Sequence, residues 1–332
     1  MKRVAIIGAG GWGTALSIVL ARNAEAIRLW VFEPDLCDRL TRTRVNDLYL
    51  PGVFIPPNVE PTQELSCAVA DAEVVITVVP SQYLRRLCEE IAPLARPDQV
   101  FVSATKGLEC GTLRRMSEVI TESLKNRFPP KLAVLSGPTF AREVAHGLPA
   151  AVTIASVEKN LARRLQHQFA NATLRLYTNN DVIGVELGGA LKNIIAIAVG
   201  VCEGLGLGWN AVAALVTRGL AEITRLACAC GARRETLAGL SGLGDLVLTS
   251  TGVLSRNRRV GVELGRGRQL RDILASWQMV AEGINTTAAA LELARQKAVE
   301  MPITEQMYAV LYEDRSPLDA VRELMGRRPS AE

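Results

Sequence analysis

The first residues whose types and spacing could do chemistry are three glycines near the start of the chain. Gly8, Gly10 and Gly13 form a G-x-G-x-x-G loop between an apolar run, residues 2–7, and a helix-like stretch, residues 14–20. Strand, loop and helix in this order are the context in which the motif binds a dinucleotide. The first glycine allows a tight turn, the second lets a pyrophosphate approach the backbone, and the third lets helix and strand pack closely. An ordinary strand-to-helix turn is the alternative.

A lysine stands in the most apolar part of the chain. Residues 182–202 contain only two charged side chains, those of Glu186 and Lys192. A buried ammonium is costly unless it is paired or neutral, so the presence of Lys192 needs an explanation, and proton transfer to or from a ligand is one. Gly188 and Gly189 lie on the same side of the expected helix, and we expect them to leave room for a ligand. A lysine that extends to solvent is the alternative, and spacing alone leaves the two open.

Two further groups of polar residues follow predicted strands, at the edge where open α/β sheets bind their ligands. Lys106 follows the apolar run 100–104, which puts it near the reactive end of a dinucleotide, unless it is a solvated loop lysine. Gly137 and Thr139 follow the run 132–135 and offer backbone N–H and hydroxyl groups before a helix. Turn chemistry alone would also explain the glycine–proline pair there.

A basic segment near residue 256 offers a site for a phosphate. Arg256 can bind a phosphate bidentately, flanked by the hydroxyl of Ser255 and the amide of Asn257. Asp245, a few residues earlier, could hold a lysine in place. A solvated basic face is the alternative. The segment lacks the interleaved aromatic residues of a nucleic-acid patch, and the net charge of the chain is only +4.

A carboxylate at position 33 bears on the choice of cofactor. In dinucleotide-binding folds an acidic residue about 20 residues after the glycine loop bonds the ribose 2′-hydroxyl of NAD. Glu33 fits that distance and would repel the 2′-phosphate of NADP, and Pro34 and Asp35 provide no arginine to neutralise it. We therefore expect NAD or NADP with NAD favoured. Phe32 packs either on the adenine or in the core.

The secondary structure expected to position these residues changes once along the chain, from alternating strands and helices to helices alone. Strand-like runs alternate with helical patterns up to Asn179-Asn180-Asp181, which predicts a mainly parallel sheet with helices on both faces. Helical patterns follow to the end. The expected fold is an α/β N-terminal Rossmann-like dinucleotide-binding domain, residues 1–180, followed by an all-α C-terminal domain, residues 181–332, that binds substrate and carries catalysis. The strand-like runs are 27–32, 74–79, 100–104, 132–135, 151–155 and 174–177. The helical patterns include 83–91, 112–124, 158–169, 286–299 and 304–312, and residues 182–230 are expected to form two long helices separated by residues 204–208.

Bulk composition narrows the class of protein. The chain has 332 residues, seven scattered cysteines without a C-x-x-C pair, and two histidines, which favours a reducing compartment and no metal site. No clean run reaches the about 20 apolar residues of a membrane span. A strand that begins at residue 3 leaves no room for a cleaved leader. We expect a cytoplasmic enzyme with a small-molecule partner and no nucleic acid.

Taken together, these segments resemble the NAD(P)-dependent glycerol-3-phosphate dehydrogenases, in particular the bacterial sn-glycerol-3-phosphate dehydrogenase family. The resemblance covers essentially the whole chain. Trp-Val-Phe-Glu at 30–33 is more similar to the NAD-preferring eukaryotic members. The matching motifs are Gly-Ala-Gly-Gly-Trp-Gly at 8–13, Val-Val-Pro-Ser at 78–81, Ala-Thr-Lys-Gly at 104–107, Ser-Gly-Pro-Thr-Phe at 136–140, Val-Glu-Leu-Gly-Gly-Ala-Leu-Lys-Asn-Ile at 185–194, Gly-Leu-Gly-Asp-Leu-Val-Leu-Thr at 242–249, Ser-Arg-Asn-Arg-Arg at 255–259 and Glu-Met-Pro-Ile-Thr at 300–304.

The resemblance implies reversible reduction of dihydroxyacetone phosphate to sn-glycerol 3-phosphate, which supplies phospholipid synthesis, by a homodimer. It implies that Lys192 is the proton donor and acceptor. The implied catalytic residues are Lys192, Lys106, Asp245 and Thr249; the implied substrate residues are Lys106, Gly137, Thr139, Lys192, Asp245, Ser255, Arg256 and Asn257; and the dinucleotide residues are Gly8, Gly10, Gly11, Trp12, Gly13, Phe32, Glu33, Lys106, Ala141, Arg256, Val280 and Glu282.

Two alternatives stay open at this point. A related two-domain hydroxyacid or ketopantoate dehydrogenase should lack the Ser-Arg-Asn-Arg-Arg segment. A non-catalytic NAD-binding sensor would have no reason to carry Lys192, Lys106 and Asp245 together.

Overall fold

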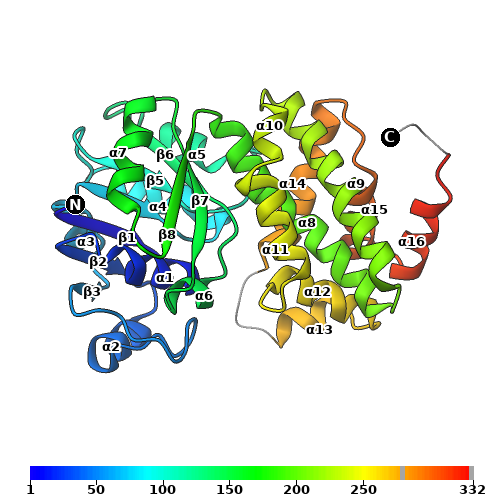
Figure 1. Ribbon diagram of the computed structural model, residues 1–332, viewed down its shortest axis with the longest axis horizontal. Coiled ribbons are helices and arrows are strands. Elements are labelled where there is room, and N and C mark those ends of the chain that lie inside the picture. The colour runs from blue at the N-terminus through cyan, green and yellow to red at the C-terminus, as the bar shows by residue number, and fades with distance from the viewer. Residues whose placement is uncertain (277–280, 329–332) are drawn as a thin grey trace. The chain divides into compact units, whose positions relative to one another are not determined.

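A computed structural model describes residues 1–276 and 281–328 of the chain. By packing, the chain divides into two compact units (Figure 1). Unit 1 comprises Met1–Lys106 and Arg114–Glu186, and unit 2 comprises Gly107–Leu113 and Leu187–Glu332. This division concerns packing, and the expected boundary of the two domains between residues 180 and 181 stays a prediction. The sequence patterns gave no sign that the short segment Gly107–Leu113 packs with the helical unit.

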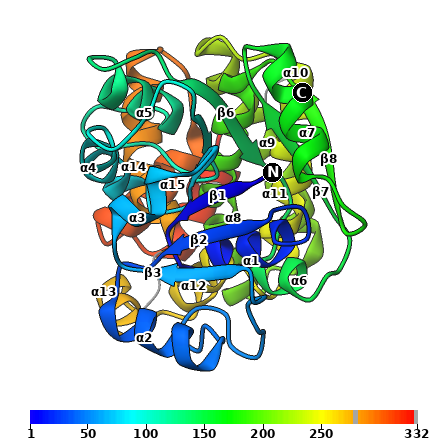
Figure 2. The ribbon, with the colours of Figure 1, turned by 90° about the vertical axis from the view of Figure 1, so that its left-hand side faces the viewer.

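Unit 1 contains an eight-stranded sheet in the order β3-β2-β1-β4-β5-β6-β7-β8. The order reverses at β1, so the loops after β1 and β4 meet at the point where such sheets bind ligands. Figure 2 shows β1, β2 and β3 side by side. The strands are β1 Arg3–Ile7, β2 Ala26–Trp30, β3 Val59–Thr62, β4 Val74–Thr77, β5 Val100–Ser103, β6 Lys131–Ser136, β7 Ala150–Ala155 and β8 Leu174–Asn179.

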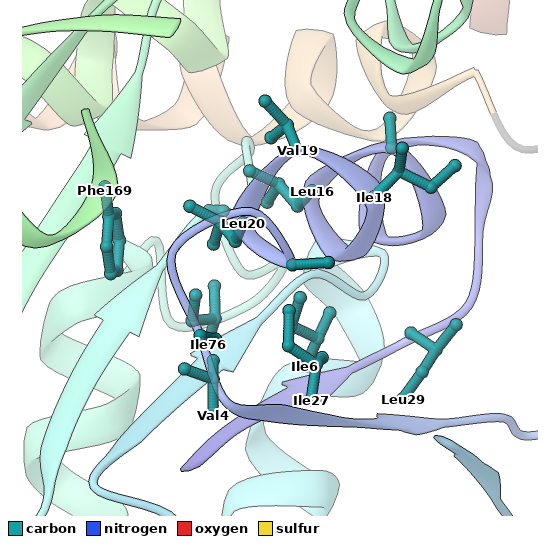
Figure 3. Close-up of a cluster of buried hydrophobic side chains, with 14 of the residues drawn as sticks. Val4, Ile6, Leu16, Ile18, Val19, Leu20, Ile27, Leu29, Ile76 and Phe169 are labelled. Carbon is teal, nitrogen blue, oxygen red and sulfur yellow. The ribbon is translucent and has the colours of Figure 1, made fainter. Parts of the chain in front are cut away.

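Helices cover both faces of this sheet, because alternate strand residues point to opposite sides. One buried cluster joins strand residues such as Val4 and Ile6 to α1, α2, α6 and α7, and Figure 3 shows Leu16 and Leu20 of α1 packed over the strands. The second buried cluster joins the strand residues on the opposite face, such as Ala5, to α3, α4 and α5. The helices of the sheet unit are α1 Gly11–Leu20, α2 Pro34–Thr43, α3 Leu65–Ala70, α4 Leu84–Ile91, α5 Met116–Leu124, α6 Ala141–Ala145 and α7 Lys159–Phe169.

The predicted fold class is confirmed, and four details differ. β2 ends at Trp30, so Phe32 lies beyond the strand. β7 runs antiparallel to β6, whereas the other neighbouring strands are parallel. The patterns missed β3, whose four residues include a proline that weakens the strand signal. The expected helix over 112–124 begins only at Met116, because Arg115 is extended and forms a capping box with Glu118.

Unit 2 is helical, as predicted. Asp181, one of three expected capping residues, accepts a hydrogen bond from the N–H of Gly184 at 2.9 Å and so caps α8. The helices are α8 Val182–Gly204, α9 Gly208–Ala229, α10 Arg234–Leu237, the π-helical turn η2 Leu240–Gly244, α11 Asp245–Thr251, α12 Arg256–Gly265, α13 Leu270–Ala275, α14 Glu282–Gln296, α15 Pro302–Tyr312 and α16 Pro317–Met325.

Helix α8 is long and apolar enough to cross a membrane by length and composition alone, and a bent helix pair, residues 234–265, passes the same test as one span. The most apolar window of α8 is 89% buried inside the protein, as in the core helix of a globular domain. Its apolar character is therefore explained by packing.

Four glycines bring α8 and α12 into backbone contact. A Cβ on Gly200 would lie 2.0 Å from the carbonyl oxygen of Arg258, and one on Gly261 would lie 2.0 Å from that of Ile197. Gly204 and Gly265 repeat the arrangement one turn later. No other residue type permits this approach, which fixes the start of α12 relative to α8.

A buried carboxylate in unit 2 holds the first turn of α15. Glu222 of α9 is 1% exposed and accepts hydrogen bonds from the N–H groups of Ile303 and Thr304 and from the Thr304 hydroxyl, at 2.7–2.9 Å. The Glu222 carboxyl thus accepts hydrogen bonds from N–H groups that a helix start leaves without partners. Burial raises the pKa of the Glu222 carboxyl, although the donated hydrogen bonds oppose that rise.

We predict that Glu222→Ala lowers the free energy of unfolding by about 1–3 kcal/mol, because buried N–H groups lose their acceptor. Glu222→Gln should cost less. Since the folded pKa is raised, the contribution of Glu222 is greatest with the carboxyl protonated, below its unfolded value of about 4.3, and declines as the pH rises through the folded value. Denaturant unfolding of both variants between about pH 4 and 8 checks this. A constant difference between wild type and Glu222→Gln over that range would contradict it.

Candidate active site

The glycine loop of unit 1 has the geometry that its spacing predicts. Gly8 has a φ of +119°, which disfavours any residue with a Cβ, and a Cβ there would lie 2.5 Å from the carbonyl oxygen of Val78 after β4. A Cβ on Gly13 would lie 1.9 Å from the carbonyl oxygen of Gly8. Around Gly10 a Cβ would meet nothing within 4 Å. Two glycines thus serve the close packing of strand and helix, while the third borders open space.

The start of α1 is suited to a phosphate. No described side chain caps the helix, and its first turn contains no acidic residue. The helix dipole and the first N–H groups therefore favour an anion there. The indole Nε1 of Trp12 is buried and has no hydrogen-bond partner among the described residues. These features fit a dinucleotide.

Glu33 and Phe32 both lie past the end of β2. Glu33 is the residue before α2, yet its side chain does not cap that helix. One of its oxygens, Oε1, instead accepts a hydrogen bond from the Tyr49 hydroxyl at 2.6 Å. Phe32 is 75% exposed, so the interpretation of Phe32 as a core residue is wrong, and its ring is open to contact with an adenine.

Lys106, Gly137 and Thr139 meet within unit 1. The ammonium of Lys106 donates to the carbonyl oxygen of Gly137 at 3.0 Å, and the Thr139 hydroxyl donates to the same oxygen at 3.2 Å. Lys106 is half-buried, so a freely solvated loop lysine is excluded. Gly137 approaches β7 closely, since a Cβ there would lie 2.9 Å from the Cα of Val152. Ala141 begins the short helix α6.

Lys192, Asp245 and Thr249 form a buried cluster in unit 2. The Lys192 ammonium, 6% exposed, donates to Asp245 Oδ1 and to Thr249 Oγ1, the latter at 2.6 Å. The Thr249 hydroxyl lies 3.4 Å from the same Asp245 oxygen. Asp245 is 1% exposed. The ammonium is thus paired rather than extended to solvent, and the alternative that it reaches water is excluded.

The expected purpose of Gly188 is wrong. A Cβ on Gly188 would lie 2.7 Å from the carbonyl oxygen of Ser241 and 3.2 Å from the Cα of Gly242. The missing side chain therefore admits the backbone of η2 rather than a ligand. Because Asp245 follows η2 directly, this packing sets the position of the carboxylate that holds Lys192.

The residues expected to bind a phosphate gather at the start of α12. The Ser255 hydroxyl accepts from the Arg258 N–H at 3.2 Å and caps the helix, and Arg256 is exposed on its first turn. Asn257 is buried: its amide donates to Asn193 Oδ1 at 2.9 Å and its oxygen accepts from the Gly283 N–H at 3.0 Å. Asn257 thus links α8, α12 and α14.

Two predicted dinucleotide contacts remain. Glu282 is half-buried at the start of α14. Val280 lies outside the described residues.

Comparison with known proteins identifies the family. The model of the NAD-dependent glycerol-3-phosphate dehydrogenase N-terminus matches residues 3–162, and that of the C-terminus matches residues 181–322. The chain belongs to the NAD-dependent glycerol-3-phosphate dehydrogenase family.

The similar proteins match this chain over nearly the whole length of both sequences. The glycerol-3-phosphate dehydrogenase [NAD(P)+] of Koribacter versatilis is 58% identical over 100% of this chain and 99% of its own. That of Syntrophotalea carbinolica is 50% identical over 99% of each. The crystal structure of glycerol-3-phosphate dehydrogenase from Coxiella burnetii superposes with a TM-score of 0.93 at 42% identity, covering 98% of this chain and 99% of that one.

Sequence reasoning missed several residues that hold the family's motif residues in place. Asn193 and the α8–α12 glycines were not singled out, although Gly200/Gly204 and Gly261/Gly265 share a four-residue spacing that signals close helix packing. Tyr49 and Asn46 had no signal, because their partners are distant in the sequence.

We predict that Gly10→Ala leaves stability within about 0.5 kcal/mol of wild type, since its backbone suits alanine and its Cβ meets nothing. The new methyl should obstruct the pyrophosphate and raise the Kd for NADH at least about tenfold, or 1.4 kcal/mol. Thermal denaturation and NADH fluorescence titration test both halves. The comparison variant Gly13→Ala should unfold more easily. Wild-type NADH affinity in Gly10→Ala would refute the assignment.

Proposed function

We propose that this chain catalyses the reversible reduction of dihydroxyacetone phosphate to sn-glycerol 3-phosphate, with NADH or NADPH as the reductant, and so supplies glycerol phosphate for phospholipid synthesis. Membership in the dehydrogenase family supports this reaction over a hydroxyacid or ketopantoate dehydrogenase. The observation that carries the chemistry is the buried Lys192–Asp245–Thr249 cluster, which a non-catalytic sensor would not need.

Lys192 is the proposed proton donor. When bound, the reduced dinucleotide supplies the hydride that the carbonyl carbon accepts. The oxygen then gains negative charge, and the Lys192 ammonium donates a proton to it; in the reverse direction the neutral amine takes the proton back. Asp245 keeps the amine oriented, while Thr249 restricts its rotation.

The substrate is held by residues from several elements. Arg256, Ser255 and Asn257 bind the phosphate, and the first-turn N–H groups of α12 add to their attraction for an anion. Lys106, with Gly137 and Thr139, binds the substrate and stabilises the developing charge. Fixed geometry of this kind supplies much of the rate acceleration.

The dinucleotide is held by Gly8, Gly10, Gly11, Trp12 and Gly13, with Phe32 and Glu33 at the adenosine end; Ala141, Arg256, Val280 and Glu282 are further contacts by family resemblance. Glu33 makes NADH the preferred cofactor, because its carboxylate can accept a hydrogen bond from the ribose 2′-hydroxyl but repels the 2′-phosphate of NADPH.

We also propose that the enzyme is a cytoplasmic homodimer. Unit 2 exposes large apolar side chains around the start of α9, with Trp209 at 76% and Leu207 at 37% exposed. Exposed apolar groups of this size are typical of protein interfaces.

We predict that Lys192→Met lowers kcat about 10²–10⁴-fold while NADH binding persists, because general acid–base catalysis is lost. The single change removes the ammonium that pairs with the buried Asp245, so Lys192→Met/Asp245→Asn provides a variant that lacks both charges. Exposed Lys297→Met serves as the control. If a folded Lys192→Met variant keeps more than about a tenth of wild-type kcat, Lys192 is not the proton-transfer group.

We predict that Arg256→Ala weakens use of dihydroxyacetone phosphate by about 1.5–3 kcal/mol in kcat/KM, since a charge-assisted phosphate contact is lost. Activity with unphosphorylated dihydroxyacetone should change little. Arg271→Ala, whose side chain is 85% exposed on α13, is the matched control. Equal losses on both substrates would argue against a phosphate contact.

We predict a higher kcat/KM with NADH than with NADPH, and a smaller ratio in Glu33→Gln. Steady-state kinetics with both cofactors measures this, with exposed Glu25→Gln as the control. A wild-type preference for NADPH would refute the proposal, and an unchanged ratio in Glu33→Gln would exclude Glu33 as the selecting residue.

A further inference from the structure

The Glu33 carboxylate is held by a segment that lies far from it in the sequence. The Tyr49 hydroxyl donates to Glu33 Oε1 at 2.6 Å, and both side chains are half-buried. A hydrogen bond to an ionised group is shorter and stronger than a neutral one. The other oxygen, Oε2, receives no hydrogen bond from the residues that the structure describes. One carboxylate oxygen is thus fixed and the other stays available as an acceptor.

The backbone of Tyr49 lies against the glycine loop. A Cβ on Gly11 would come within 3.0 Å of the Tyr49 carbonyl oxygen. The Tyr49 N–H also donates to Asn46 Oδ1 at 2.9 Å. Tyr49 therefore touches Gly11 with its main chain and Glu33 with its side chain.

Asn46 joins the same segment to the loop from the other side. Its side chain is 0% exposed, and its amide donates to the carbonyl oxygen of Ala9 and to Thr14 Oγ1, each at 2.8 Å. All three hydrogen bonds of the amide group are short and lie inside the protein. Asn46 thus fixes Tyr49 to the loop at which a pyrophosphate would bind.

A second tie connects α2 to this segment. Arg39 donates to both carboxylate oxygens of Asp47, at 3.1 and 2.9 Å. The Arg39 guanidinium on α2 is therefore already paired with a carboxylate and less available to neutralise a 2′-phosphate.

We propose that Tyr49 is a specificity-determining positioning residue: anchored by Asn46 to the glycine loop, it holds Glu33 so that Oε2 reads the ribose 2′-hydroxyl. This rests on the proposed role of Glu33. Without the Tyr49 hydroxyl the carboxylate can rotate, which weakens its bond to a 2′-hydroxyl and lets it move away from a 2′-phosphate. Both changes reduce the preference for NADH.

The test compares equilibrium binding of NADH and NADPH by titration calorimetry in wild type, Tyr49→Phe, Glu33→Gln and the double variant. We expect Tyr49→Phe to lower the Kd(NADPH)/Kd(NADH) ratio at least threefold, with little further change when it is added to Glu33→Gln. Tyr177→Phe, at an exposed tyrosine on β8, is the matched control. AMP and adenosine 2′,5′-bisphosphate should show the same trend, which locates the effect at the 2′ position.

The outcomes separate the two ideas. If Glu33→Gln lowers the ratio and Tyr49→Phe does not, Glu33 selects the cofactor but Tyr49 does not position it. If Glu33→Gln leaves the ratio unchanged, the proposed role of Glu33 fails, and the inference with it. An equal effect of Tyr49→Phe in the Glu33→Gln background would mean that Tyr49 acts independently of Glu33. Should Tyr49→Phe fold poorly, Glu33→Asp, which keeps the charge but shortens its reach, must lower the ratio instead.

Discussion

The constraint on which unit 2 depends is the burial of an ammonium group inside its most apolar helix. Leaving a buried charge such as Lys192 without its partner typically costs about 3–5 kcal/mol, a large fraction of the stability of a domain. Asp245 and Thr249 remove that difficulty, and they do so only because α11 begins beside α8. The close approach depends on Gly188, which admits the backbone of η2. The pairing of Lys192 and the packing of these helices therefore depend on the same contact.

Glycines also allow the backbones of α8 and α12 to touch. With Gly200 and Gly261 nearly touching, the start of α12 is fixed, and the buried Asn257 amide joins Asn193 to Gly283. Arg256 is exposed next to this rigid link. The side chain proposed to bind the phosphate therefore stands on a helix start whose backbone is fixed by its neighbours.

Much of the fold and part of the site can be read from the sequence, and the division has a physical cause. Strands, the glycine loop and the long helices have local periodicity or spacing, so their approximate bounds and the family's motif residues were predictable. Segment Gly107–Leu113, the antiparallel β7, and the links through Asn46, Tyr49 and Asn193 depend on contacts between distant residues, for which a single sequence carries no signal. Lys192 shows the limit: its burial could be suspected from its neighbours and Asp245 was expected to hold a lysine, but the two residues are 53 positions apart, so spacing alone does not pair them.

The glycines show why motif spacing underdetermines mechanism. Gly13 and Gly188 have no side chain because backbone from another segment occupies that space, whereas Gly10 has none beside space that the protein leaves open. The sequence-based expectation treated Gly188 as though it resembled Gly10, and the error follows from identical residue type with opposite surroundings. A glycine whose Cβ would clash belongs to the stability of the fold, and one whose Cβ would meet nothing, in a conformation that alanine also adopts, points to an external partner. By that criterion Gly10 is the glycine of the loop at which the proposed dinucleotide, rather than the protein itself, would require the absent side chain.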